Sequence, residues 1–274
     1  MIDLHTHSTE SDGSYTPAEL VKLAADRGIK ILALTDHDTI AGNTAAAQQA
    51  RQSGIRFIPG VEMEIKHELG EIHLLGLGLV KDLGEFKTGL ARSTHSRIIR
   101  NRQIRQKMEA AGILVTDTDL AEVVRGSVVG RPHFARILVA RGVVATIDEA
   151  FKHYLGTGKP FFVGKKTPSL YACIQMIKRA GGISVLAHPI TLQLTPRKLK
   201  QYLMQWKKQG LDGIEAFHPE HKIKFSLDLE KFGIYNKFIV TGGSDFHGTA
   251  RLSRHLGHAT ADLPIPERLA QYFL

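Results

Sequence analysis

The chain has 274 residues, of which 43% are hydrophobic and 23% are charged, the balance of an ordinary soluble globular protein. It contains no run of 18 apolar residues and no signal-peptide pattern, so we expect a cytoplasmic protein with no membrane partner. The single cysteine, Cys173, excludes an intrachain disulfide. The formal net charge of +9 favours an anionic partner, although a solvated basic face would give the same charge.

Short apolar runs alternate with amphipathic stretches along most of the chain, which is typical of βα units. The first helix is predicted to begin after Thr16, because Thr16, Pro17 and Glu19 form a capping-box sequence, and to end at Gly28. We expect strands at the apolar runs 2–4, 31–34, 57–61, 72–79, 183–187, 213–217 and 238–241.

Two stretches depart from the βα pattern. Residues 60–77 alternate about a turn at Leu69-Gly70, which predicts a β-hairpin. From about Lys81 to Pro168 the strand signal disappears, and the sequence is helical and basic. We therefore predict an α/β barrel of residues 1–80 and 169–274, interrupted by a helical, substrate-binding insertion domain of residues 81–168. A further barrel helix is expected between Thr195-Pro196 and Gly210.

Residues that bind metals follow most of the predicted strands. His5 and His7 alternate along the first strand and so point to the same side, and Asp12 lies in the loop just beyond. The same kinds of residue recur at the later strands, as Asp36-His37-Asp38, Glu62, His73, His188, Glu215 with His218, and Asp245 with His247. Because the strand ends of an α/β barrel meet at one mouth, we expect these side chains to converge. A set of imidazole and carboxylate ligands without thiolate exceeds the need of one ion, so two or three divalent ions (Mn, Fe or Zn) are indicated.

Six motifs occur in order along the chain: DLHTHS followed by DG, TDHD, GVE, IHLLG, LAHP and GSDFH. Together they resemble the polymerase-and-histidinol-phosphatase (PHP) family over residues 1–80 and about 170–260. The resemblance implies a distorted (β/α)7, TIM-like barrel with a trinuclear metal site, for which Mn²⁺ is the first expectation. It also implies three ligand sets: His5, His7, Glu62 and Asp245; the bridging Glu62 with His73 and His188; and Asp12, His37 and His247.

Substrate choice is expected to depend on the insertion. The sequence GRPHFAR begins a helix in which Arg131 can form a bidentate contact with phosphate and the helix N-terminus adds backbone donors. A solvated basic helix is the alternative. The segment resembles the PHP branch of nucleoside 3′,5′-bisphosphate phosphatases and the 5′→3′ exoribonuclease RNase AM, which implies that Arg131 and His133 bind a phosphate remote from the scissile one. His218 and His221 are placed to join them, or lie at the surface.

A helix near residues 86–111 carries five arginines that could follow an RNA backbone or simply maintain solubility: Arg92, Arg97, Arg100, Arg102 and Arg105. Its apolar residues Ile98, Ile99, Ile104 and Met108 are expected to lie partly on one face.

The hypothesis from sequence is a metal-dependent phosphoesterase that uses metal-activated hydroxide. It would remove the 3′-phosphate of nucleoside 3′,5′-bisphosphates, degrade short 5′-phosphorylated RNA in the 5′→3′ direction, or do both. No catalytic residue beyond the metal ligands is assigned, and no stable protein partner is implied. The alternatives are a histidinol-phosphate phosphatase and a non-catalytic RNA-binding module with a structural metal cluster.

Overall fold

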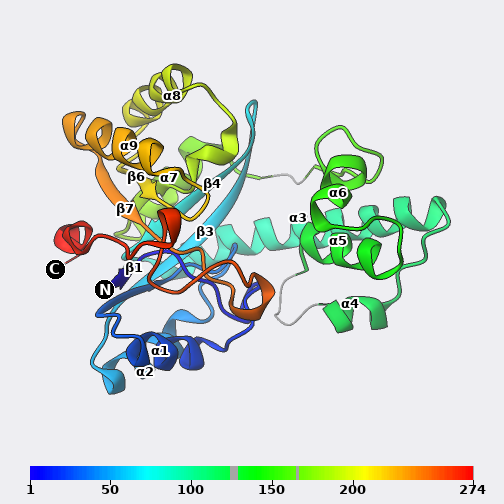
Figure 1. Ribbon diagram of the computed structural model, residues 1–274, viewed down its shortest axis with the longest axis horizontal. Helices are drawn as coiled ribbons and strands as arrows, with labels where there is room; N and C mark the ends of the chain where they lie inside the picture. Colours follow the sequence, from blue (N-terminus) through cyan, green and yellow to red (C-terminus); the bar gives the residue numbers. More distant parts are fainter. Residues whose placement is uncertain (124–128, 165–166, 274) are drawn as a thin grey trace.

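The computed structural model describes residues 1–123, 129–164 and 167–273 (Figure 1). One seven-stranded sheet contains the strands in sequence order. They are β1 (Ile2–Asp3), β2 (Ile31–Leu34), β3 (Arg56–His67), β4 (Gly70–Leu77), β5 (Ile183–Leu186), β6 (Gly213–Phe217) and β7 (Ile239–Gly242). All neighbouring strands are parallel except at β4, which runs antiparallel to both β3 and β5. The predicted hairpin is confirmed, with His67 paired to Gly70 across the turn.

The sheet nearly closes on itself. Beyond the short β1, Leu4 N donates to Gly242 O at 3.3 Å, and Thr6 forms a parallel bridge with Phe246. The predicted distorted α/β barrel is therefore confirmed, and the antiparallel β4 is its main departure from a regular βα repeat.

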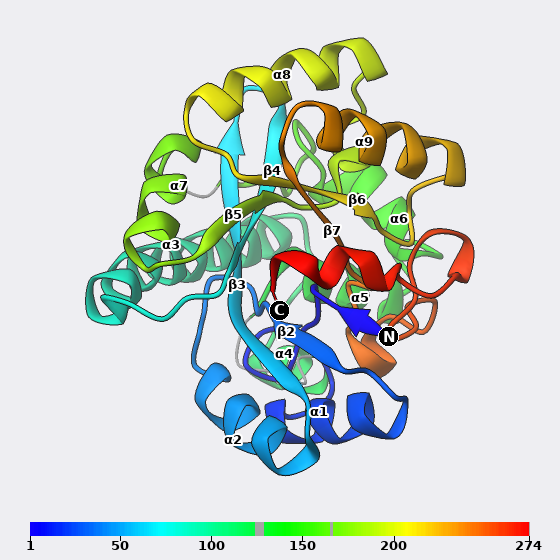
Figure 2. The ribbon, with the colours of Figure 1, turned by 90° about the vertical axis from the view of Figure 1, so that its left-hand side faces the viewer.

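Helices cover the outside of the barrel (Figure 2): α1 (Pro17–Asp26), α2 (Asn43–Ser53), α7 (Leu170–Arg179), α8 (Pro196–Lys208) and α9 (Ile223–Tyr235). The predicted capping box is present, since Glu19 N donates to Thr16 Oγ1 while Thr16 N donates to Glu19 Oε2. Gly28 follows the end of α1 with φ of 72°, a conformation that glycine adopts without steric cost. Cys173 of α7 is buried in the barrel core, as expected of an inert thiol.

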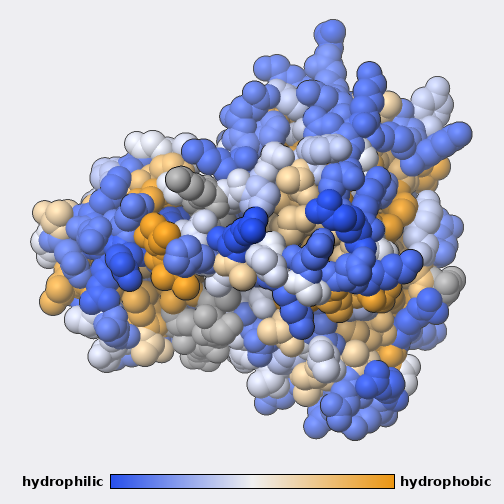
Figure 3. Space-filling view, turned by 180° about the vertical axis from the view of Figure 1, so that it is seen from behind, coloured by the Kyte–Doolittle hydropathy of each residue, from blue (hydrophilic) through white to orange (hydrophobic). Residues whose placement is uncertain are grey.

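Between β4 and β5 the described residues form helices and turns but no strand. These are α3 (Leu83–Ala110), α4 (Asp117–Val123), α5 (Arg131–Ala140), α6 (Ile147–Ala150) and a π-helical turn, η1 (Phe151–Leu155). They form a lobe beside the barrel, seen from opposite sides in Figures 1 and 3. The helical character expected of this stretch is confirmed, while the exact domain boundaries stay a prediction.

The long helix α3 joins the two lobes. Phe86 and Leu90 in its first half pack into the barrel core, and Ile104 and Met108 in its second half pack into the core of the insertion. Ile98 and Ile99 are exposed, so the expectation that they share a face with Ile104 and Met108 is wrong.

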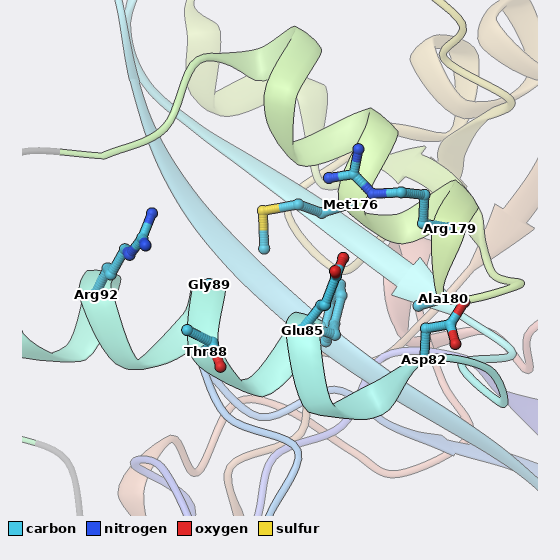
Figure 4. Close-up of a pocket in the computed structure, with 9 residues that line it drawn as sticks. Asp82, Glu85, Thr88, Gly89, Arg92, Met176, Arg179 and Ala180 are labelled. Atoms are coloured by element: carbon cyan, nitrogen blue, oxygen red, sulfur yellow. The ribbon is translucent and has the colours of Figure 1, made fainter.

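The first half of α3 also packs tightly on α7. Met176 of α7 lies over Gly89 of α3 (Figure 4), and a Cβ at Gly89 would collide with its side chain. The surface pocket beside this contact, about 350 Å³, shares none of its described lining residues with the cavities at the strand ends. Of the helices in the described part of the chain, none has the length and apolar character needed to cross a membrane.

Candidate metal centre

The nine predicted ligands come together at the mouth of the barrel. Eight of them form three overlapping groups, in each of which one ligand atom per residue lies within 4.8 Å of the others. The groups are His5, His7, Glu62 and Asp245; His7, Asp12, His37 and His247; and His37, Glu62 and His73. The ninth, His188, places its Nε2 2.9 Å from Glu62 Oε1. The grouping differs from the implied sets because His7 and His37 each belong to two groups.

Glu62 is the hub of this arrangement. Its Oε2 lies 3.2 Å from His5 Nε2, from His7 Nε2 and from His37 Nδ1. Its Oε1 lies 2.7 Å from His73 Nδ1. Glu62 is thus a buried carboxylate surrounded by five imidazole rings. Each of its oxygens has several ring nitrogens close to it, and one shared proton could not bond to all of them, so the carboxylate is suited to bridge cations.

Several buried atoms of the cluster make no hydrogen bond within the described residues: His5 Nε2, His7 Nε2, His37 Nδ1, Glu62 Oε2 and His247 Nε2. Buried polar atoms left without partners are costly, so natural proteins rarely contain such a group of them. All five face the common space between the ligands. The donor set, imidazole and carboxylate without thiolate, therefore fits divalent metal ions.

A second layer of residues orients these ligands. Glu215 Oε1 lies 3.0 Å from His5 Nδ1, and Glu215 Oε2 accepts a 2.7 Å hydrogen bond from the backbone N of His188. His247 Nδ1 lies 2.7 Å from the carbonyl oxygen of Asp245, which leaves its Nε2 for the cluster. Such partners fix the tautomer and direction of a metal-binding histidine. The sequence places Glu215 among the residues expected to converge but assigns it no role. The feature that distinguishes it is that it is the one acidic residue in the otherwise apolar strand GIEAF.

Backbone geometry at the strand ends is also unusual. Asp38, His188 and Asp245 have φ of 53°, 25° and 52°, in a region that residues other than glycine rarely adopt. Such outliers concentrate at functional sites, where the surrounding structure holds them in place. Here they turn the chain sharply just after β2, β5 and β7.

Burial and charge set the protonation of the cluster. Burial lowers the pKa of the His37 ring to about 3, so this ring is neutral and offers a lone pair. Burial also opposes ionisation of Asp245, but Arg251, His247 and His5 outweigh it and hold the pKa of that carboxyl well below its usual range. Metal ligands must be deprotonated, so both residues are prepared to bind at neutral pH.

Arg131 begins α5, as predicted, and its guanidinium forms an ion pair with Glu71. It lines a cavity of about 180 Å³ together with three predicted ligands (Asp12, His37 and His73) and with Arg97, Arg100 and Arg251. The structure thus brings Arg131 to the edge of the metal cluster. Its role in binding phosphate stays a prediction.

The three other predicted substrate residues are buried. His133 Nδ1 accepts a 2.9 Å hydrogen bond from Gly130 N and so caps the start of α5. His218 places its Nε2 3.5 Å from Asp245 Oδ2 and lines a second cavity, of about 140 Å³, next to His188. His221 Nδ1 lies 2.9 Å from the carbonyl oxygen of Ala216, so the surface position considered for His218 and His221 is wrong.

Two arginines of α3 are not on a solvated face. Arg97 Nη2 donates to Asp38 Oδ2 at 2.5 Å and lies 3.2 Å from Glu64 Oε2, and Arg100 Nη1 donates to Glu64 Oε1 at 3.2 Å. Both arginines are buried, so the expectation that they face RNA or bulk solvent is wrong for them. They instead attach α3 to the barrel beside the predicted ligands His37 and Glu62.

Arg251 was missed altogether. Its Nη1 donates to Asp245 Oδ2 at 2.8 Å, and its side chain lines both cavities. It lies in an irregular loop after β7, where the sequence carries no pattern that distinguishes it from other surface arginines.

Comparison with known proteins gives a consistent result. The model of the PHP domain matches residues 3–159. A 3′,5′-nucleoside bisphosphate phosphatase from Chromobacterium violaceum is 36% identical over 96% of this chain and 92% of its own length. A 5′-3′ exoribonuclease from Haemophilus influenzae is 36% identical over 97% of this chain and 98% of its own. Among solved structures, the chain is similar to an amidohydrolase from Chromobacterium violaceum that contains sulfate and no metal. The TM-score is 0.86 at 33% sequence identity, and the match covers 96% of this chain and 92% of that one.

Proposed function

The chain belongs to the PHP domain family, and we propose on that premise that it is a metal-dependent phosphoesterase acting on nucleotides. Its substrates are nucleoside 3′,5′-bisphosphates, from which it removes the 3′-phosphate, and short 5′-phosphorylated RNA, which it degrades in the 5′→3′ direction. The relatives named for these two activities support the proposal. The observation that carries it is a cluster of buried, unpartnered imidazole and carboxylate atoms that opens into a cavity lined by arginines.

We propose that the nine converging residues hold three divalent ions, with Mn²⁺ as the first candidate and Fe or Zn as alternatives. The proposed sets are His5, His7, Glu62 and Asp245; Glu62, His73 and His188; and Asp12, His37 and His247, of which the first two share Glu62. The first set is one of the close groups of ligand atoms, the third lies within another, and His73 and His188 lie 2.7 and 2.9 Å from Glu62 Oε1. When bound, such ions lower the pKa of water and offset charge on a reacting phosphoryl group. We also place the enzyme in the cytoplasm.

The side chains around the cluster bind and orient the substrate. Arg131 pairs with the phosphate remote from the reaction, exchanging its contact with Glu71 for two charge-assisted hydrogen bonds. Arg251 is held by Asp245 through one nitrogen, and its side chain lines both cavities, where the remaining N–H groups can donate to the scissile phosphate. His218 borders the same space, and burial lowers the pKa of its ring, which keeps it neutral beside the anion.

One site can serve both substrates. A nucleoside 3′,5′-bisphosphate and the first nucleotide of a 5′-phosphorylated RNA present the same pair of groups, a 5′-phosphate and a 3′-phosphoester. Anchoring the first at Arg131 places the second toward the metal cluster. The leaving group is then the 3′-oxygen of the anchored nucleotide in both reactions, and the substrates differ only in whether the phosphate of the 3′-phosphoester also carries the rest of an RNA chain.

The test uses purified protein reconstituted with Mn²⁺. Phosphate release is measured from adenosine 3′,5′-bisphosphate and from histidinol phosphate, and cleavage is followed on RNA oligomers with a 5′-phosphate or a 5′-hydroxyl. We expect turnover of the bisphosphate and preference for 5′-phosphorylated RNA, both lost on addition of a chelator. The proposal fails if neither nucleotide substrate is hydrolysed. Hydrolysis of histidinol phosphate alone would identify the enzymatic alternative, and RNA binding without cleavage would identify a binding module.

A further inference from the structure

A larger cavity, of about 590 Å³, lies on the insertion side of the metal cluster. It is formed by the tip of the β3–β4 hairpin and by the segment where the chain returns from the insertion. Lys66 N in the hairpin donates a 2.8 Å hydrogen bond to Thr167 Oγ1 in that segment, which holds the two walls together. The proposed function places no part of the substrate in this cavity.

The cavity adjoins the one at the metal cluster. The two share Glu64, Glu71 and Arg100 as lining residues, so they are neighbouring parts of one depression. Arg131 stands at the junction, because its guanidinium pairs with Glu71 on one side and lies 5.8 Å from the centre of the Phe162 ring on the other. A group in the larger cavity would therefore lie next to whatever Arg131 binds.

The lining of the cavity selects the kind of group. Its wall carries three carboxylates (Glu64, Glu68 and Glu71) and two cations (Lys66 and Arg100). Because Arg100 is already paired with Glu64, the lining offers a phosphate no excess of positive charge. Leu69, Phe162 and Val163 supply apolar surface, and the Phe162 ring provides a flat face. A neutral planar ring with polar edges is the group that such a lining accommodates, and base–aromatic stacking tolerates any nucleobase because each has a π-face.

We propose that this cavity is the nucleobase subsite, in which Phe162 stacks on the base of the nucleotide whose 5′-phosphate is paired with Arg131. The inference rests on the proposed function and deepens it, since only a ribose separates the base from the 5′-phosphate of one nucleotide. It assigns Phe162 to binding and predicts that the enzyme gains affinity from the base without reading its identity.

The experiment compares two substrates that differ only in the base: adenosine 3′,5′-bisphosphate and abasic 1-deoxyribose 3,5-bisphosphate. Phe162→Leu retains an apolar side chain and removes the ring. We expect its kcat/KM for the adenosine substrate to fall about 10-fold, mainly through KM, with the abasic substrate changed by less than about twofold. Phe162→Tyr should restore the value for the adenosine substrate. Phe232→Leu is the matched control, because this ring also lies beside a cation, Lys200 at 5.3 Å, but on the outer side of the barrel.

Each outcome is informative. An equal loss of kcat/KM on both substrates in Phe162→Leu would mean that Phe162 supports the fold or positions Arg131 and contacts no base. An unchanged kcat/KM for the adenosine substrate would refute the proposed base subsite. Both results would leave the proposed phosphoesterase activity intact, since they require a wild-type enzyme that hydrolyses the nucleotide. Failure of the wild-type protein to hydrolyse adenosine 3′,5′-bisphosphate would instead overturn the proposed function, and the subsite with it.

Discussion

Replacing Arg131 by alanine should weaken the binding of nucleotide substrates without loss of metal. The Arg131 side chain is 13% exposed and is paired with Glu71, whose Oε1 lies 3.4 Å from His73 Nε2. Arg131 therefore meets the predicted metal ligands only through an intervening carboxylate. A variant without the guanidinium keeps all nine predicted ligands, so metal content per chain should not change.

The size of the effect follows from two opposing contributions. Hydrogen bonds from a guanidinium to a charged group contribute about 1.5–3 kcal/mol. The pair with Glu71 must first be exchanged, and because the Glu71 side chain is 36% exposed this costs at most about 1 kcal/mol after solvent screening. The net contribution is about 1–2 kcal/mol, so kcat/KM for a 3′,5′-bisphosphate should fall by roughly 5- to 30-fold.

The assay includes a substrate that has no remote phosphate. Wild type and Arg131→Ala are compared on adenosine 3′,5′-bisphosphate and on adenosine 3′-monophosphate, with metal content measured by mass spectrometry. The loss should appear only for the bisphosphate. Arg131→Lys keeps the charge but loses the bidentate geometry, so its kcat/KM for the bisphosphate should lie between those of wild type and Arg131→Ala. An equal loss on both substrates, or a drop in metal content, would refute the assigned role.

Three further predictions concern the support of the site. Arg97→Met removes the cation 2.5 Å from the buried Asp38 carboxylate and should lower the free energy of unfolding in urea by about 3 kcal/mol, and a change under about 1 kcal/mol would contradict the pairing. Glu215→Gln weakens the acceptor 3.0 Å from His5 Nδ1 and should reduce metal affinity by about 10-fold or more in calorimetric titration, which an unchanged affinity would disprove. Burial lowers the pKa of His221 to about 4, so the stability that a neutral ring provides is present above pH 6.5 and is lost as the pH falls toward 4, by up to about 3 kcal/mol. With a chelator present, the free energy of unfolding of His221→Gln should therefore fall less than that of wild type between pH 7 and 4.5. An identical fall in both proteins would contradict the proposed role of the neutral His221 ring.

The parts of the fold that were predicted correctly depend on local patterns. The capping box at Thr16 and the hairpin turn at Leu69-Gly70 each involve residues within a few positions of one another. The convergence of His5 and Glu62 at one mouth could also be predicted, because parallel strands in a barrel must end on the same side. A short-range pattern and one topological rule were sufficient in these cases.

The parts that could not be predicted depend on distant partners. Arg97 meets Asp38, which lies 59 positions earlier, and Glu215 meets His5, which lies 210 positions earlier. On sequence alone Arg97 is indistinguishable from the solvated arginines around it, because burial of a charge depends on a partner that only the fold supplies. His133 makes a contact that the sequence did not reveal, since its Nδ1 accepts a hydrogen bond from Gly130 N at the start of its own helix. Its expected role in binding the substrate stays a prediction.

The contacts of the insertion with the barrel share one feature that has a consequence for the metal centre. Each barrel carboxylate paired with an insertion arginine lies one or two positions from a predicted ligand: Asp38 follows His37, Glu64 follows Glu62, and Glu71 precedes His73. A displacement of the insertion would therefore pull on the strand ends that hold the cluster. If Arg131 binds a phosphate as proposed, only its pair with Glu71 is released, whereas the buried pairs at Asp38 and Glu64 stay in place. The insertion can thus exchange substrate at one contact while the other two keep the ligands fixed, and for this reason Arg97→Met should also lower metal affinity, whereas Arg131→Ala should leave it unchanged.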